Sequence, residues 1–169
     1  TFIFGIGTFG SKIMQMILVP LYTVYMTTGE FGVADIISST NSLISPILML
    51  GIGNGILRFL LNQKENEKTI TKFAVSVSFG GTLLLFLLSP IYTRIESVGS
   101  YGFFIPLIYL FSSLATFLGQ VCKAEEKNVL YAVNGIVNTV VLTIFCVITL
   151  AYLKLGVWGY LFSITISYL

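Results

Sequence analysis

The chain has 169 residues, of which 56% are hydrophobic and only 9% are charged, and its formal net charge is +2. A soluble domain carries about 25% charged residues, so this composition excludes an ordinary water-soluble fold. The apolar runs are continuous rather than alternating, and several reach the roughly 20 residues that a helix needs to cross a bilayer. We therefore predict an all-α, polytopic transmembrane helix bundle whose first partner is the lipid bilayer.

The first predicted helix covers residues 2–26 and carries Lys12 inside an otherwise apolar run. A lysine at bilayer depth costs about 2.5–3.5 kcal/mol on insertion scales, so its ammonium group should face protein or water. With about 100° of rotation per residue, Gln15 and Tyr22 fall on the same side of the helix. We interpret this side as the wall of a polar cavity. A lysine paired with a carboxylate, or one that snorkels to the interface, is the alternative.

The second predicted helix covers residues 31–61 and contains Pro46. At 1.5 Å per residue it would be roughly 46 Å long, which exceeds the hydrocarbon core, so it must tilt, kink or protrude. Asp35 is a candidate outer gate, a coupling site for a cation, or a helix cap. Arg58 is either an interface anchor or a ligand residue, and Asn41 is a further candidate between them.

Four more helices are predicted at residues 72–92, 101–122, 129–153 and 156–169, the last cut off inside an apolar run. The chain begins without methionine, so we expect it to be part of a longer protein. Two of these helices carry polar stripes, which either bond neighbouring helices at about 0.6 kcal/mol per hydrogen bond or line a hydrophilic chamber. We favour the chamber because several helices carry such stripes. The stripes are Tyr109, Ser112, Ser113, Thr116 and Gln120, and then Tyr131, Asn134 and Asn138.

Lysine and arginine are distributed unevenly over the predicted loops, with six flanking the second-to-third and fourth-to-fifth connections and two flanking the others. The positive-inside rule places the first group in the cytoplasm, and the N-terminus with it. The first group is Arg58, Lys64, Lys68, Lys72, Lys123 and Lys127, and the second is Arg94 and Lys154.

Residues that could perform catalysis or hold a metal are missing from the pattern. Histidine is absent, and the two cysteines, Cys122 and Cys146, fall on different predicted helices without a CxxC motif. There is no nucleophile elbow and no pair of carboxylates at one depth. We therefore expect a protein that is not an enzyme, with no metal, no cofactor and no nucleic-acid partner.

A series of stretches resembles the N-terminal half of the polysaccharide biosynthesis flippases. These are the O-antigen and teichoic or capsular polysaccharide flippases of the multidrug/oligosaccharidyl-lipid/polysaccharide exporter superfamily. The stretches are residues 4–12, 19–23, 30–35, 46–48 and 51–59, and the helix start that holds Tyr131, Ala132, Asn134 and Gly135.

The resemblance implies two lobes related by a pseudo-two-fold axis, of which this chain supplies the N-terminal lobe, with the C-terminal lobe as its partner. It implies a transporter of the bacterial cytoplasmic membrane that flips oligosaccharide linked to undecaprenyl pyrophosphate, with Lys12 on the pyrophosphate. The resemblance does not specify whether transport is coupled to an ion such as H⁺ or Na⁺. The rivals are a cation-coupled small-molecule exporter and a membrane-embedded glycan polymerase or glycosyltransferase. The candidate substrate-binding residues are Lys12, Gln15, Tyr22, Asp35, Asn41, Arg58, Asn134 and Asn138.

Overall fold

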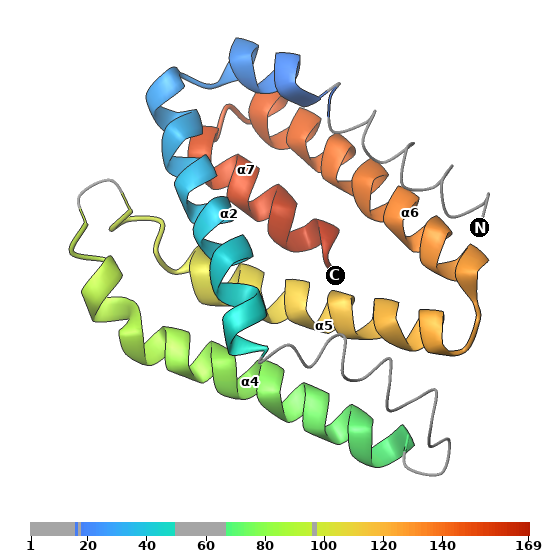
Figure 1. Cartoon of the computed structure of the whole chain (residues 1–169). Coiled ribbons are helices and arrows are strands. Elements are labelled where there is room, and N and C mark those ends of the chain that lie inside the picture. The colour runs from blue at the N-terminus through green and yellow to red at the C-terminus, as the bar shows by residue number, and fades with distance from the viewer. Residues whose placement is uncertain (1–15, 17, 50–66, 96–97) are drawn as a thin grey trace.

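The computed structural model describes residues 16, 18–49, 67–95 and 98–169, and every regular element in these ranges is a helix (Figure 1). Residues 18–25 form a helical segment at the beginning of the described chain. The predicted all-α class is confirmed. The elements that follow are α2 (Thr28–Leu48), α4 (Glu67–Tyr92), α5 (Phe104–Ala124), α6 (Asn128–Cys146), the π-helix η2 (Val147–Tyr152) and α7 (Gly156–Ser167).

Three stretches of the described chain are long and apolar enough to cross a membrane, Thr69–Tyr92, Phe104–Ala124 and Val129–Tyr152. Their outward faces carry large apolar side chains such as Leu87 and Val137, which are more than half exposed. Exposed apolar surface of this kind is stable against lipid and costly in water. The molecule is therefore a transmembrane helix bundle, as the composition predicts.

Helix α7 lies at the centre of the arrangement, where it packs against α2, α5 and α6 (Figure 1). Leu161 of α7, Ile37 of α2, Ile108 of α5 and Leu150 of η2 are buried in one apolar core. Helices α4 and α5 lie side by side at the edge of the bundle. The short helix α7 thus forms the centre of the bundle, and the longer helices α2, α5 and α6 pack around it.

The turn between the first helical segment and α2 is held by a capping box. The Thr27 hydroxyl accepts a hydrogen bond from the Glu30 backbone N–H at 3.3 Å, and the Glu30 carboxylate accepts one from the Thr27 backbone N–H at 2.8 Å. This reciprocal pair satisfies backbone donors that a helix start leaves unpaired. The interpretation of Asp35 as the cap of this helix is therefore wrong, because Thr27 and Glu30 perform that role.

Several helix bounds differ from those read from hydropathy. Helix α2 ends at Leu48, and the predicted continuation to residue 61 lies largely outside the described residues. Helix α4 begins at Glu67 rather than at residue 72, because charged residues are compatible with a first helical turn. Helix α5 begins at Phe104 rather than at residue 101, because a series of tight turns, including Tyr101 N–H to Val98 carbonyl at 2.9 Å, precedes it.

The fifth predicted helix is not uniform, because its last part is the π-helix η2. Thr149 of η2 reaches α7, where its hydroxyl lies 3.1 Å from the Gly159 carbonyl and 3.0 Å from the Ser163 hydroxyl. A β-carbon at Gly159 would come within 2.9 Å of the Thr149 β-carbon. The glycine therefore permits the close approach that seats α7 in the bundle.

Candidate functional site

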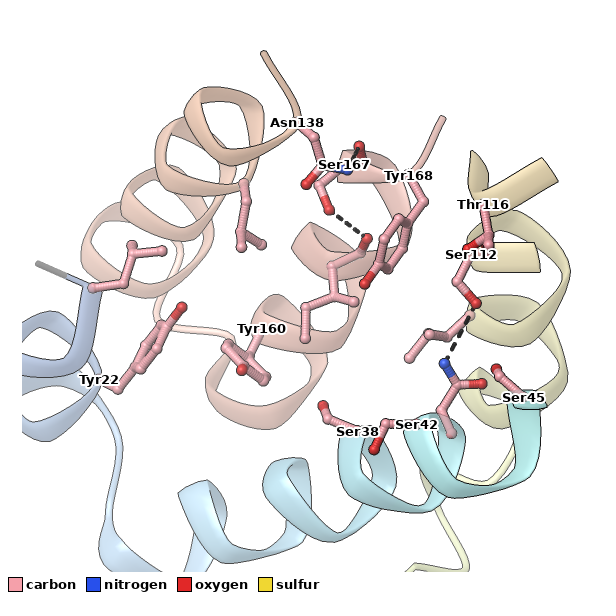
Figure 2. A pocket seen from close by; sticks show the side chains of 15 residues that line it. Tyr22, Ser38, Ser42, Ser45, Ser112, Thr116, Asn138, Tyr160, Ser167 and Tyr168 are labelled. Carbon is pink, nitrogen blue, oxygen red and sulfur yellow. Dashed lines mark hydrogen bonds between the residues drawn. The ribbon is translucent and has the colours of Figure 1, made fainter. Parts of the chain in front are cut away.

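A cavity of about 440 Å³ lies inside the bundle, between the segment 18–25 and helices α2, α5, α6 and α7 (Figure 2). We call it the bundle cavity. Its volume falls within the roughly 300–1,000 Å³ that small-molecule sites occupy. Its lining is Leu18, Tyr22, Ser38, Asn41, Ser42, Ser45, Ile108, Ser112, Thr116, Asn138, Leu142, Tyr160, Ile164, Ser167 and Tyr168.

One wall of the bundle cavity is a polar face of α2. Ser38, Asn41, Ser42 and Ser45 follow the three- and four-residue spacing that places side chains on one side of a helix. Figure 2 shows the labelled serines of this wall opposite Ser112 of α5. The Asn41 amide nitrogen is 3.5 Å from the Ser112 hydroxyl, a long hydrogen bond that links α2 to α5.

A second polar wall comes from α6 and from the end of α7. The Asn138 amide nitrogen donates a hydrogen bond to the Ser167 carbonyl at 2.5 Å, and Tyr168 lies beside this pair (Figure 2). The carbonyl of Ser167 belongs to the last turn of α7, where backbone acceptors lack helical partners. Asn138 therefore satisfies one of these acceptors and ties α6 to α7 at the cavity.

Tyrosine rings close a third side of the bundle cavity. Tyr22 and Tyr160 meet edge to face, with their ring centroids 4.9 Å apart. Edge-to-face contact is a preferred geometry for aromatic pairs and adds about 0.5–1.5 kcal/mol beyond area burial. Figure 2 shows both rings beside the hollow, so the first helical segment and α7 both contribute to its lining.

The lining is polar but carries no formal charge in the parts of the chain that the structure describes. None of its side chains is an aspartate, glutamate, lysine or arginine. Hydroxyl and amide groups supply the polar surface, while Leu18, Ile108, Leu142 and Ile164 supply the apolar surface. Such a surface can hold water or a neutral polar ligand inside an otherwise apolar bundle.

Comparison with known protein families identifies the chain. A family model described as polysaccharide biosynthesis protein matches residues 1–169, which is the whole sequence. The chain belongs to this family. No curated protein and no solved structure matches it significantly. The family and the spanning helices together make it a membrane protein related to polysaccharide biosynthesis.

The candidate residues of this polysaccharide biosynthesis protein fall into separate groups. Tyr22, Asn41 and Asn138 line the bundle cavity. Asp35 and Asn134 are exposed and do not contribute to its lining. Lys12, Gln15 and Arg58 lie outside the described residues, so their predicted roles stay predictions.

The polar stripes divide in the same way. Of the predicted stripe on α5, Ser112 and Thr116 line the bundle cavity, where they meet Ser38 and Ser42 of α2. Tyr109 does not, because it is fully buried and its ring packs over Gly81 of α4. The residues of one predicted polar stripe on α5 therefore divide between the cavity and the contact with α4.

Sequence reasoning missed the contribution of α7 and of Ser45. Tyr160, Ser167 and Tyr168 line the bundle cavity but lie in a stretch that reads as one apolar run. The available signal was the set of hydroxyl residues at Ser163, Thr165 and Ser167, which is unusual in a helix that only faces lipid. These three residues are all buried.

Proposed function

We propose that this chain forms the N-terminal transmembrane lobe of a transporter that flips undecaprenyl-pyrophosphate-linked oligosaccharide across the bacterial cytoplasmic membrane by alternating access. It acts by transport and not by catalysis, together with a C-terminal lobe of the same protein. The N-terminus faces the cytoplasm, in keeping with the distribution of lysine and arginine.

The observation that carries the proposal is a cavity between helices of a membrane bundle, lined by hydroxyl and amide groups and, among the described residues, by no charged side chain. Polar groups buried at bilayer depth are costly unless they bond to one another or serve a hydrophilic ligand. A cavity of about 440 Å³ is larger than interhelical hydrogen bonding requires. Together with membership of the polysaccharide biosynthesis family, it supports a cargo rich in hydroxyl groups.

The placement of Asp35 favours this proposal over a cation-coupled exporter. An exporter of that kind uses a carboxylate that can exchange a proton or sodium ion in the transport path. Asp35 is exposed and does not line the bundle cavity. The carboxylate that a cation-coupled exporter would need is therefore not among the lining residues of the cavity.

Lys12 provides the test of the proposal. In a strain that lacks its own flippase, the full-length protein should restore surface polysaccharide. We expect Lys12→Ala to reduce export at least about tenfold, because a charge-assisted contact to pyrophosphate contributes roughly 1.5–3 kcal/mol. Lys12→Arg should retain part of the activity, and Lys72→Ala, which removes an exposed lysine on α4, should leave export unchanged. Normal export by Lys12→Ala would refute the assigned role of the ammonium group.

A further inference from the structure

Two polar atoms on the α2 wall of the bundle cavity are buried and have no hydrogen-bond partner in the described part of the chain. They are the amide oxygen of Asn41 and the hydroxyl oxygen of Ser45. The two residues lie one helical turn apart on the cavity face, and Asn41 is only 7% exposed. A buried polar group without a partner costs about 1–3 kcal/mol. The wall is therefore incomplete without a hydrogen-bonding ligand or water.

The other hydroxyl groups of the cavity mostly donate their protons to their own helices. Ser38 donates to the Ala34 carbonyl at 2.9 Å, and Ser42 donates to the Ser39 carbonyl at 2.8 Å. Thr116 donates to the Ser112 carbonyl at 2.7 Å. A hydroxyl has one proton and two lone pairs, so these groups face the cavity mainly as acceptors. The cavity therefore suits a ligand that brings hydrogen-bond donors, and the unpaired Ser45 hydroxyl can also donate to an acceptor of that ligand.

The absence of charged side chains from the described lining indicates that the ligand is neutral. A phosphate or carboxylate would meet acceptor oxygens and no cationic side chain among the described lining residues. A bare cation would meet no carboxylate there, so its desolvation would be poorly compensated. A neutral molecule with several hydroxyl groups supplies the donors without either penalty.

Helices α5, α6 and α7 add apolar and aromatic side chains to the lining, next to their polar groups. Tyr160 and Tyr168 of the α7 region stand with Ile108, Leu142 and Ile164 around the hollow, and Figure 2 shows both tyrosines facing the serines of α2. A pyranose ring has the same division, because its rim carries hydroxyl groups and its faces carry C–H groups. The cavity thus offers hydrogen-bonding groups to the rim of the ring and apolar side chains to its faces.

We propose that the bundle cavity is a subsite for an uncharged sugar unit, in which the Asn41 amide oxygen accepts a hydrogen bond from a sugar hydroxyl group and the Ser45 hydroxyl exchanges hydrogen bonds with another. The inference rests on the proposed function insofar as this sugar belongs to the transported glycan. The described lining of the subsite contacts the neutral part of the cargo. Asn41 and Ser45 are then residues that determine which glycan is accepted.

The test is saturation-transfer difference NMR on the purified full-length protein in detergent micelles. The probes are glucose, galactose and N-acetylglucosamine as neutral sugars, glucuronic acid and glucose 1-phosphate as anions, and choline as a cation. We expect transfer to at least one neutral sugar and clearly weaker transfer to the anions and to choline. No transfer to any neutral sugar, or equal or stronger transfer to the anions or to choline, would overturn the proposal.

Matched variants locate the binding on α2. Asn41→Ala and Ser45→Ala should each weaken binding of the neutral sugar about 3- to 10-fold, which corresponds to one neutral hydrogen bond. Ser45→Ala removes a single oxygen, so it tests the site even if Asn41→Ala folds poorly. Ser39→Ala removes an exposed hydroxyl from the same helix outside the cavity and should bind normally. Unchanged binding in Ser45→Ala would refute the assignment.

The subsite and the proposed function fail in different experiments. A protein that binds free neutral sugar through Asn41 and Ser45 but does not restore polysaccharide export has the subsite without the flippase activity. A protein that restores export but gives no transfer to neutral sugars lacks the subsite, and the transport proposal then stands without it.

Discussion

Asn134 and Asn138 lie one turn apart on α6, yet only one of them reaches into the bundle. Asn138 donates to the Ser167 carbonyl and lines the bundle cavity, whereas Asn134 is exposed. We expect Asn138→Ala to lower the stability of the full-length protein by about 0.6–1.7 kcal/mol, which spans the average and the maximum found for hydrogen bonds between membrane helices.

Asn134→Ala is the matched control for this prediction, and it should change stability by less than about 0.5 kcal/mol. The measurement is the thermal unfolding midpoint of the purified protein in one detergent. Equal shifts for the two variants would show that the bond to Ser167 does not contribute.

The capping box at the start of α2 gives a second prediction at the residue scale. Thr27→Ala removes the hydroxyl that accepts the Glu30 backbone N–H, and it should cost about 0.5–2 kcal/mol. Thr28→Ala changes an exposed first helical residue and should be nearly neutral. Thermal unfolding of the two variants side by side checks this, and a larger loss in Thr28→Ala would contradict the assigned cap.

At the scale of elements, α4 and α5 depend on a close contact at one of two adjacent glycines. A β-carbon at Gly81 would overlap the hydroxyl and ring of Tyr109, while one at Gly80 would meet open space. Tyr109 is fully buried, so its ring has little room to move. We expect Gly81→Ala to destabilise the protein by about 1–3 kcal/mol, the usual cost of overpacking.

Gly80→Ala is the control on the same helix and should be neutral or stabilising by up to about 1 kcal/mol, because alanine favours helix. Tyr109→Phe removes one of the overlapping atoms and should partly restore stability to Gly81→Ala. Unfolding midpoints of the two single variants and the double variant decide the matter. If Gly80→Ala lost stability and Gly81→Ala did not, the close contact with Tyr109 would not lie at Gly81.

At the scale of the whole molecule, the loop charges predict which side of the membrane each connection occupies. Glu126 in the α5–α6 connection should face the cytoplasm, and Ser100 in the α4–α5 connection should face outward. Both residues are exposed. In a Cys122→Ser, Cys146→Ala background, Ser100→Cys should react with a membrane-impermeant maleimide in intact cells. Glu126→Cys should react only after permeabilisation, and the reverse pattern would invert the topology.

Local properties of the sequence, namely hydropathy and helical periodicity, were enough to predict the spanning helices and their polar faces. The length and apolarity of each run predict spanning helices, because a backbone in lipid must bond within its own segment. Helical periodicity also assigns Ser38 with Ser42 and Ser112 with Thr116 to common faces, since that spacing is local. Even the polar turn at Thr27 to Glu30 is visible as the boundary between two helices.

The sequence by itself determined the class of the molecule, an all-α membrane bundle with polar faces, because hydropathy and helical spacing are properties of single segments. Only the tertiary structure decided which polar faces share a cavity. It placed Asn138 and Tyr22 inside and Asn134 and Asp35 outside, and it added Ser45, Tyr160 and Ser167. The reason is that each helix's rotation and depth depend on its neighbours, above all on α7, which is held by contacts with other helices such as Asn138 to Ser167.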